Sequence, residues 1–192
     1  MLVLVGPPAA GKTTVGRLVA QRLGVDLTDT DELVVARAGK PVADIFVDSG
    51  EEAFRELEAG AVAEALVGTG GVLALGGGAV LSAVTRRLLA GHPVVFLATG
   101  VPAAAARVGL NRDRPLLLGN PRQQLRALLD ARLPLYREVA AATVETDERT
   151  ADEVADAVLA ALATLPRPAA PPLAGDIAGD AVVGDEVPAD RA

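Results

Sequence analysis

The segment Gly6-Pro7-Pro8-Ala9-Ala10-Gly11-Lys12-Thr13 constrains this chain more than any other, because it matches the pattern GxxxxGK[ST]. The apolar run at 2–5 precedes it and predicts a strand, and a helix-forming stretch follows it. In this context the loop turns its backbone N–H groups inward and the helix presents its positive end, so that phosphates are held. The sequence therefore predicts a nucleoside triphosphate site.

The residues of this loop have separate expected tasks. Lys12 reaches the β- and γ-phosphates, and the Thr13 hydroxyl can ligate Mg²⁺. Gly6 and Gly11 permit a backbone geometry and a close approach that a Cβ would obstruct. The ATP-binding residues expected in the loop and the first helical turn are Ala9, Ala10, Gly11, Lys12, Thr13 and Thr14.

Short apolar runs bounded by glycine alternate with longer segments of helical period. This alternation predicts an α/β fold of three layers, in which helices flank a five-stranded parallel sheet. Strands are predicted at about 2–5, 26–28, 72–75, 94–98 and 142–146.

Polar and proline residues mark where helices begin. Ser49 with Glu52, and Thr150 with Glu153, have the spacing of capping boxes, which predicts helices near 50–67 and 150–163. Prolines at 41 and 102 suit the first turns of further helices, where a missing N–H has no cost.

Composition excludes several classes of protein. The chain has 192 residues, which is enough for one domain, and it has no cysteine, which excludes disulfides, thiolate zinc sites and a cysteine nucleophile. The single histidine, His92, argues against a Ser/His/Asp hydrolase. A net charge of −7 disfavours binding to nucleic acid or to an anionic membrane. No apolar run is long enough to span a bilayer, so we expect a cytoplasmic protein, and a monomer.

The chain divides into a folded part and a tail. Residues 166–192 are rich in proline and acidic residues, which predicts a disordered acidic tail after a domain at 1–165. Within the domain, residues 109–121 have no clear period and predict a long loop that serves as a lid. Arginines outnumber acidic residues seven to two from Arg107 to Arg137, which indicates a bound anion.

Two further segments suggest an acceptor site. Asp29-Thr30-Asp31 follows the second predicted strand, so that an extended chain would place both carboxylates on one face, at the sheet edge where ligands bind. One carboxylate would support Mg²⁺ and the other would polarise a substrate hydroxyl. The alternative is that Thr30 or Asp31 caps the following helix. Because no acidic residue ends the strand at 72–75, Asp29 is the better candidate for the carboxylate that supports Mg²⁺.

Three consecutive glycines, Gly76-Gly77-Gly78, follow the strand at 72–75. They can expose backbone N–H groups to a ligand and permit its close approach, although a flexible loop is the alternative.

These motifs together resemble the shikimate kinase family over residues 2–162. The resemblance rests on five elements besides the phosphate-binding loop, which are Asp29-Thr30-Asp31, Gly50-Glu51 with Phe54-Arg55 and Glu58, Gly76-Gly77-Gly78-Ala79-Val80, Arg114-Pro115-Leu116-Leu117, and Arg132 with Pro134-Leu135-Tyr136. It implies a P-loop fold similar to that of nucleoside monophosphate kinases, with substrate-binding helices and a lid. It also implies phosphorylation of the 3-hydroxyl of shikimate by Mg-ATP, in the route to chorismate and aromatic amino acids.

The resemblance also implies roles for single residues. Asp31 would orient the acceptor hydroxyls and act as general base, with Lys12 and the lid residue Arg114 acting on the phosphates. Arg55 and Arg132, with Gly76, Gly77 and Gly78, would bind shikimate, and Glu58 would orient Arg55. Arg107 and Arg149 match positions that contact adenine, while Phe46 and Phe54 match pocket walls or are core residues. The metal would be held by Thr13 and Asp29.

The chain departs from the family pattern at two places, and two alternative functions stay open. The loop interior is Pro7-Pro8-Ala9-Ala10 where the family commonly has more Gly and Ser, and Arg112 with Asp113 precedes Arg114. Another kinase of this fold, acting on gluconate or a nucleoside monophosphate, would also use paired arginines. A non-catalytic nucleotide-dependent switch would require guanine recognition, and the chain contains no Asn-Lys-x-Asp element.

Overall fold

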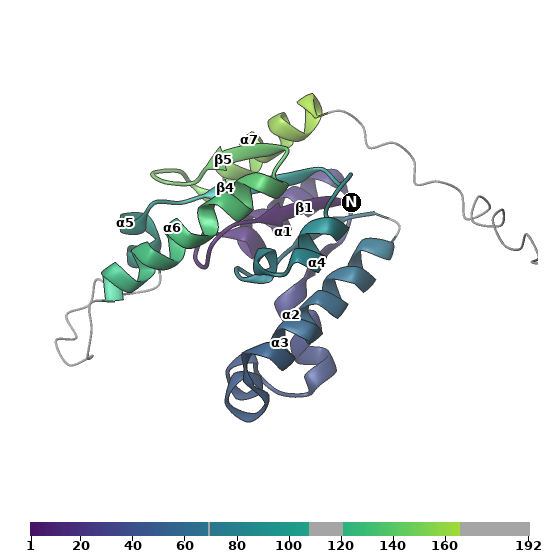
Figure 1. Ribbon diagram of the computed structural model, residues 1–192. Coiled ribbons are helices and arrows are strands. Elements are labelled where there is room, and N and C mark those ends of the chain that lie inside the picture. Colours follow the sequence, from purple (N-terminus) through teal and green to yellow (C-terminus); the bar gives the residue numbers. More distant parts are fainter. Residues whose placement is uncertain (69, 108–120, 166–192) are drawn as a thin grey trace, which may run out of the picture.

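The computed structural model describes residues 1–68, 70–107 and 121–165 (Figure 1). In this part of the chain five strands form one sheet in the order β2-β3-β1-β4-β5, and every neighbouring pair is parallel. The strands are β1 (Leu2–Val5), β2 (Leu27–Asp29), β3 (Val72–Ala74), β4 (Val94–Ala98) and β5 (Ala142–Glu145). The predicted sheet is therefore confirmed, with strand ends that shift by at most one residue.

Helices cover both faces of this sheet. They are α1 (Lys12–Leu23), α2 (Thr30–Ala38), α3 (Val42–Val67), the 3₁₀ turn η1 (Ala79–Leu81), α4 (Ala83–Leu88), α5 (Val101–Arg107), α6 (Pro121–Val139) and α7 (Ala151–Thr164). Successive residues of β1 point to opposite faces, as the geometry of a strand requires. Leu2 and Leu4 pack with α1 and α7, whereas Val3 and Val5 pack with residues of α3 and α6. The three-layer architecture follows.

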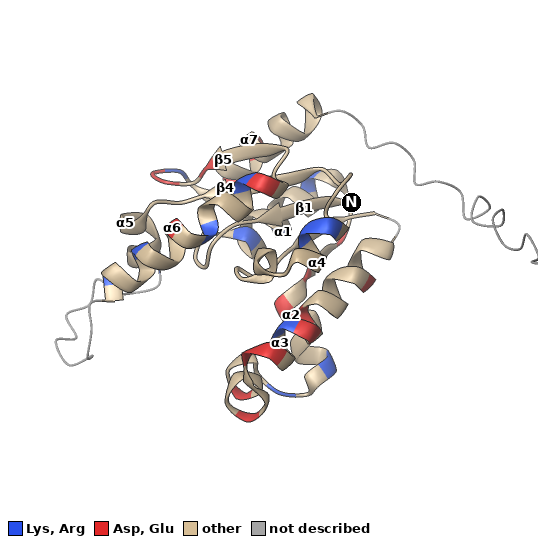
Figure 2. Ribbon diagram, viewed as in Figure 1, with Lys and Arg blue, Asp and Glu red and all other residues tan. Residues whose placement is uncertain are grey.

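Helices α2 and α3 extend away from the sheet (Figure 1). They pack against each other through a small apolar cluster of their own, formed by Val34, Ile45, Phe54 and Ala61. Acidic and basic segments lie side by side on this pair (Figure 2). The pair therefore holds charged side chains beside the sheet without disturbing the main core.

The helix predicted near 50–67 is the second part of α3. The span Val42–Val67 joins two helices across a kink at Gly50, whose φ of 81° and ψ of 174° are not helical. A helix therefore begins just after Gly50, close to the predicted start. The first part begins at Val42, with Pro41 as its N-cap residue instead of the expected first-turn residue.

The predictions at α7 and α5 hold. Thr150 and Glu153 form a capping box, in which Glu153 N donates to Thr150 Oγ1 at 3.2 Å and Thr150 N donates to Glu153 Oε2 at 2.7 Å. These bonds satisfy N–H groups that the helix itself leaves without partners. Pro102 is the second residue of α5, in its first turn as expected.

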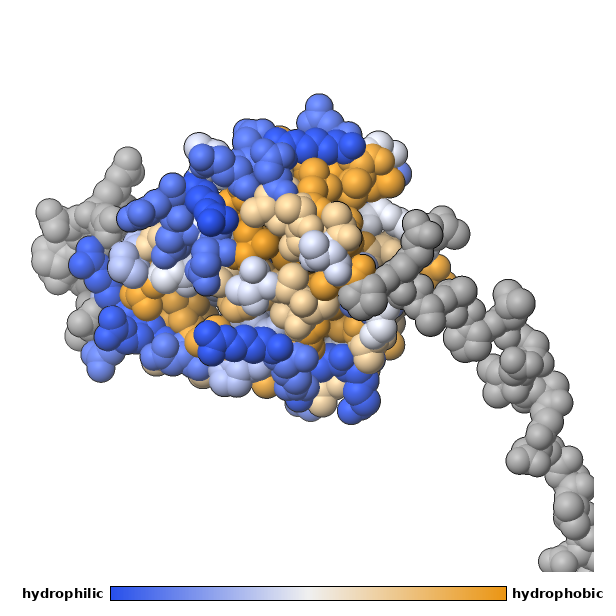
Figure 3. Space-filling view, turned by 90° about the horizontal axis from the view of Figure 1, so that it is seen from above, coloured by the Kyte–Doolittle hydropathy of each residue, from blue (hydrophilic) through white to orange (hydrophobic). Residues whose placement is uncertain are grey.

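Hydrophilic residues surround a central apolar area on the face seen in Figure 3. No helix in the described ranges is both long and apolar enough to cross a membrane. The expected tail at 166–192, and residues 109–120 of the expected lid with Arg112, Asp113 and Arg114, lie outside the described residues.

Candidate active site

The phosphate-binding loop joins β1 to α1 and depends on two glycines. Gly6 has a φ of 152°, and a Cβ there would lie 2.5 Å from the carbonyl oxygen of Leu97. Gly11 caps α1 with a φ of 88°, in the left-handed region. A residue with a side chain would collide with Leu97 at position 6 and would have a strained backbone at position 11, so both positions require glycine. The loop therefore has the compact shape that the motif predicts.

Lys12 folds back over this loop. Its Nζ donates to the carbonyl oxygens of Gly6 at 2.8 Å and Pro7 at 2.9 Å. Burial lowers the pKa of Lys12 to about 8, while the charges of Asp31 and Asp29 oppose this shift. At neutral pH the ammonium group is therefore mostly charged and available for an anion at the loop.

The side chains of Thr13 and Asp29 are hydrogen-bonded to each other. The Thr13 hydroxyl donates to Asp29 Oδ2 at 2.6 Å. The other oxygen, Oδ1, accepts from the backbone N of Asp31 at 2.9 Å, so that Asp29 is the N-cap of α2. The Asp29 carboxylate thus links α1 to α2. The side-chain oxygens of Thr13 and Asp29, the two residues expected to hold the metal, lie within hydrogen-bond distance of each other.

The extended arrangement expected for Asp29-Thr30-Asp31 is wrong. Strand β2 ends at Asp29, and Thr30 and Asp31 already belong to α2. The alternative in which Thr30 or Asp31 caps the helix is also wrong, because Asp29 does so. The fully buried Thr30 instead accepts a hydrogen bond from Gly76 N at 2.8 Å through its hydroxyl. Sequence reasoning missed this contact, which fixes the end of β3 against α2.

A cavity of about 310 Å³ brings the two sides of the site together. Its lining residues are Pro8, Ala9, Gly11, Lys12, Thr13, Thr14, Asp29, Asp31, Leu75 and Gly77. Burial raises the pKa of Asp31, the charge of Asp29 raises it further, and Lys12 and Arg55 oppose the rise. A carboxylate with a raised pKa beside a phosphate-binding lysine is suited to accept a proton during phosphoryl transfer.

Arg55 and Glu58 form an ion pair on α3. Arg55 Nη1 donates to Glu58 Oε2 at 2.6 Å, one helical turn away as expected, and Nη2 donates to Glu51 at 3.2 Å. The Glu58 side chain is only 2% exposed, and burial raises its pKa against the effect of Arg55. The pair holds the guanidinium beside the glycines that follow β3.

The three glycines after β3 pack closely against neighbouring groups, which would collide with a Cβ at each of these positions. A Cβ on Gly76 would lie 2.5 Å from Glu58 Oε1 and 2.6 Å from Asp31 Oδ1. A Cβ on Gly78 would overlap the guanidinium of Arg55. The backbone at this point therefore lies directly against the charged groups of α2 and α3.

Helix α6 reaches the same glycines from the other side. Arg132 Nη1 donates to the carbonyl oxygen of Gly77 at 3.1 Å, and the hydroxyl of Tyr136 donates to the same oxygen at 2.5 Å. Two arginines from different helices, Arg55 and Arg132, thus approach one short backbone segment. Their charges favour an anionic group at this place.

Arg107 and Arg149, which the family resemblance matches to adenine contacts, lie in different parts of the structure. Arg107 donates to the carbonyl oxygen of Ala9 at 3.2 Å and to that of Thr146 at 2.7 Å, so it lies beside the loop. Arg149 is exposed in the turn before α7, and the described hydrogen bonds do not connect it to the loop. Of the proposed pocket walls, Phe54 is a core residue and Phe46 is 37% exposed, with the two rings 4.5 Å apart.

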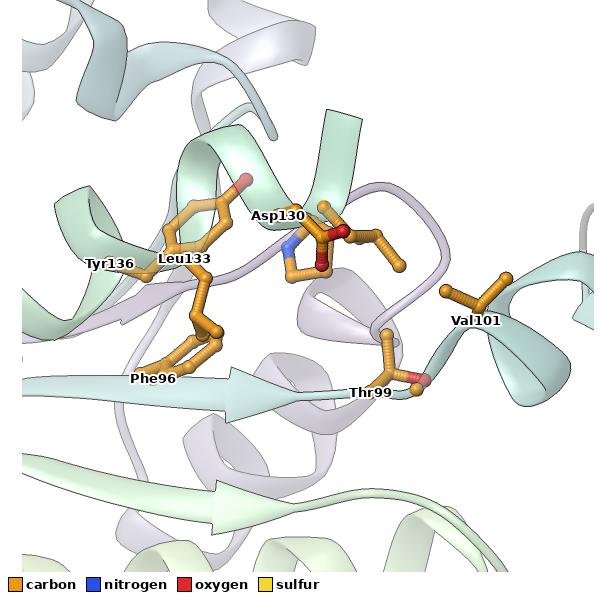
Figure 4. Close-up of a pocket in the computed structure, with 9 residues that line it drawn as sticks. Phe96, Thr99, Val101, Asp130, Leu133 and Tyr136 are labelled. Atoms are coloured by element: carbon orange, nitrogen blue, oxygen red, sulfur yellow. The ribbon is translucent and has the colours of Figure 1, made fainter. Parts of the chain in front are cut away.

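A second, smaller pocket of about 140 Å³ lies between β4 and α6 (Figure 4). Phe96, Leu133 and Tyr136 form its apolar wall, and Thr99 and Asp130 contribute polar groups. No sequence pattern predicted this pocket, since its lining residues come from distant segments.

The fold and this site define a P-loop kinase, because a phosphate-binding loop and a carboxylate line one cavity, and two arginines approach the glycine segment beside it. The family model for shikimate kinase matches residues 8–163, so the chain belongs to the shikimate kinase family.

Individual relatives agree with this assignment. A shikimate kinase from Thermobifida fusca (strain YX) is 59% identical over 158 residues, which are 82% of this chain and 92% of the relative. One from Saccharopolyspora erythraea is 58% identical over 158 residues, 82% of this chain and 90% of the relative. Among solved structures, the shikimate kinase from Acinetobacter baumannii in complex with shikimate has a TM-score of 0.78 and 41% identity, and the match covers 84% of this chain and 92% of that one.

Proposed function

We propose that this chain transfers the γ-phosphoryl group of ATP to the 3-hydroxyl of shikimate, giving ADP and 3-phosphoshikimate. The observation that carries the proposal is that Lys12 and Asp31 line one cavity. Arg55 and Arg132 approach the glycine segment beside it. The relatives and the structure named above, one of them in complex with shikimate, support the choice of acceptor.

The nucleotide side is proposed to act through charge and backbone donors. The loop N–H groups and Lys12 hold the phosphates, with further contacts from Ala9, Ala10, Gly11, Thr13 and Thr14. Arg107, which donates to the carbonyl oxygen of Ala9, is proposed to contact the nucleotide together with Arg149. Arg114 is proposed to neutralise the equatorial oxygens of the transferred group.

The residues present fit Mg²⁺, which prefers hard oxygen ligands and binds to one or two protein side chains besides substrate phosphates. Thr13 and Asp29 would hold it, since their side-chain oxygens lie 2.6 Å apart on the cavity wall. When bound, the ion neutralises charge on the phosphate oxygens.

The acceptor side is proposed to bind shikimate by its carboxylate and to prepare its hydroxyl. The guanidinium groups of Arg55 and Arg132 can grip a carboxylate with paired hydrogen bonds. Asp31 accepts the proton of the 3-hydroxyl as that oxygen forms its bond to the γ-phosphorus. The bond from phosphorus to the bridging oxygen of ADP breaks in the same in-line step, and no covalent enzyme intermediate forms.

Turnover with separate acceptors tests the reaction. ADP release from Mg-ATP is measured with shikimate, gluconate and a panel of nucleoside monophosphates, and each product is identified by mass. We expect turnover with shikimate alone. Faster turnover with another acceptor would overturn the substrate, and no turnover with any of them would favour the non-catalytic switch.

Asp31→Asn tests the proposed base. We expect kcat to fall by at least about 10²-fold, because the amide cannot accept the proton, while the Kd for ADP stays unchanged. Asp44→Asn, an exposed residue of α3 in the same helical pair, serves as the matched control and should retain full activity. Near-normal turnover of Asp31→Asn would remove Asp31 as the base.

We expect the active form to be a cytoplasmic monomer that binds neither nucleic acid nor membrane. Light scattering on the eluting peak during gel filtration would measure its mass, and a dimer mass would contradict this expectation.

A further inference from the structure

The carbonyl oxygen of Gly77 accepts two hydrogen bonds from α6. Its donors, Arg132 Nη1 at 3.1 Å and the Tyr136 hydroxyl at 2.5 Å, come from residues four apart, which lie on the same face of a helix. A carbonyl oxygen has two lone pairs and can accept both bonds at once. One backbone oxygen of the glycine segment is therefore held twice from the same element.

Tyr136 is built into the core as a rigid donor. Its side chain is 1% exposed, and its ring stacks on Phe96 of β4 with the centroids 5.1 Å apart. In Figure 4 the ring lies beside Phe96 and Leu133, and the hydroxyl points away from Phe96. Burial raises the pKa of Tyr136 to about 12, so its hydroxyl keeps its proton throughout the working range of pH.

Gly77 has little freedom on its other sides. A Cβ at this position would lie 2.8 Å from Cδ of Pro8, a residue of the phosphate-binding loop. The next residue, Gly78, lies against the guanidinium of Arg55. The orientation of the Gly77 peptide therefore affects how the acceptor side fits against the nucleotide side.

In the structure Arg132 uses Nη1 on the Gly77 carbonyl. In the proposed function its guanidinium turns to the substrate carboxylate, and a part-buried carbonyl that loses a donor is destabilised. The Tyr136 hydroxyl limits this cost, because it keeps the Gly77 oxygen hydrogen-bonded when Arg132 moves.

We propose that Tyr136 is a positioning residue for the acceptor site, whose hydroxyl holds the Gly77 carbonyl and so frees Arg132 for the substrate carboxylate. This inference rests on the proposed function of Arg132. It assigns Tyr136 to shikimate and not to ATP, because its hydroxyl contacts the glycine segment and not Lys12 or Thr13.

Tyr136→Phe tests the inference, since it removes the hydroxyl and keeps the ring against Phe96. We expect the KM for shikimate to rise about tenfold and the KM for ATP to change by less than about twofold, as for loss of one buried hydrogen bond. An unchanged KM for shikimate, or equal rises in both KM values, would overturn the positioning role.

Two control variants separate positioning from stability. Phe96→Leu disturbs the ring packing but keeps the hydroxyl, so it should lower the Tm without a selective rise in the KM for shikimate. Thr85→Val removes a different buried hydroxyl, on α4, and should leave both KM values unchanged. If Phe96→Leu gives the same selective rise as Tyr136→Phe, general loosening of the core explains the effect and the inference fails.

Arg132→Ala distinguishes this inference from the proposed function. If Arg132→Ala raises the KM for shikimate and Tyr136→Phe does not, only the role of Tyr136 is wrong. If Arg132→Ala also leaves that KM unchanged, the assignment of the acceptor site fails, and the inference about Tyr136 fails with it.

Discussion

The nucleotide side and the acceptor side of this site are built in different ways. The nucleotide side consists mainly of one continuous segment, residues 6–13, between β1 and α1. The acceptor side combines Asp31 of α2, Arg55 of α3, the glycines after β3 and Arg132 of α6. In the proposed function, phosphate binding therefore depends on local backbone geometry, whereas acceptor binding depends on how four separate elements pack.

Their charged groups differ in the same way. On the nucleotide side, Lys12 is fixed by two carbonyl oxygens of its own loop. On the acceptor side, Arg55 is paired with the buried Glu58, and Arg132 contacts a distant backbone. If this difference is functional, changes on each side should alter different kinetic constants.

Lys12→Met should have the largest effect. Removing the ammonium group at the phosphates should lower kcat by about 10³-fold, as for loss of one strong donor to the transition state. Single-turnover measurements at saturating shikimate would check this. Residual activity above about a tenth of normal would show that the loop N–H groups and the arginines suffice without Lys12.

Arg132→Ala should have the next largest effect, and on the other substrate. Loss of a charged hydrogen bond costs about 1.5–3 kcal/mol, so the KM for shikimate should rise by roughly 10- to 150-fold. The KM for ATP should stay within about twofold, measured in the same titrations. Arg87→Ala, an arginine of α4 outside the site, is the matched control. A rise in the KM for ATP alone would contradict the assignment of Arg132 to the acceptor side.

The pH dependence of ATP use should show the smallest effect. Because the pKa of Lys12 is lowered from 10.5 to about 8, the free enzyme loses this positive charge as the pH rises through 8. We expect kcat/KM for ATP to fall above about pH 8, approaching tenfold per pH unit, when measured from pH 6.5 to 9.5 with ATP limiting.

Lys12→Arg provides the control for this profile. The guanidinium does not lose its proton in this range, so the decline above pH 8 should disappear even if the activity is lower throughout. The same decline in the Lys12→Arg variant would assign it to another group.

Most of the fold could be predicted because its signals are local. Apolar runs gave all five strands, and the Thr150 capping box gave the start of α7. The Ser49 pattern predicted the place where the second part of α3 begins, since the non-helical Gly50 separates the two helices of this span. The extended geometry expected for Asp29-Thr30-Asp31 was wrong, because the Asp29 side chain caps α2 and so ends the strand.

The sequence by itself determined the phosphate-binding loop and the parallel sheet, because these depend on neighbouring residues and on hydrophobic period. The residues expected at the acceptor site followed from the family resemblance. Tertiary structure alone decided that Thr30 secures Gly76, that Glu58 is buried under Arg55, and that Tyr136 shares the Gly77 oxygen with Arg132. Gly77 and Tyr136 are 59 positions apart in the chain. Such a contact forms only when α6 packs on the sheet, and no local pattern encodes it.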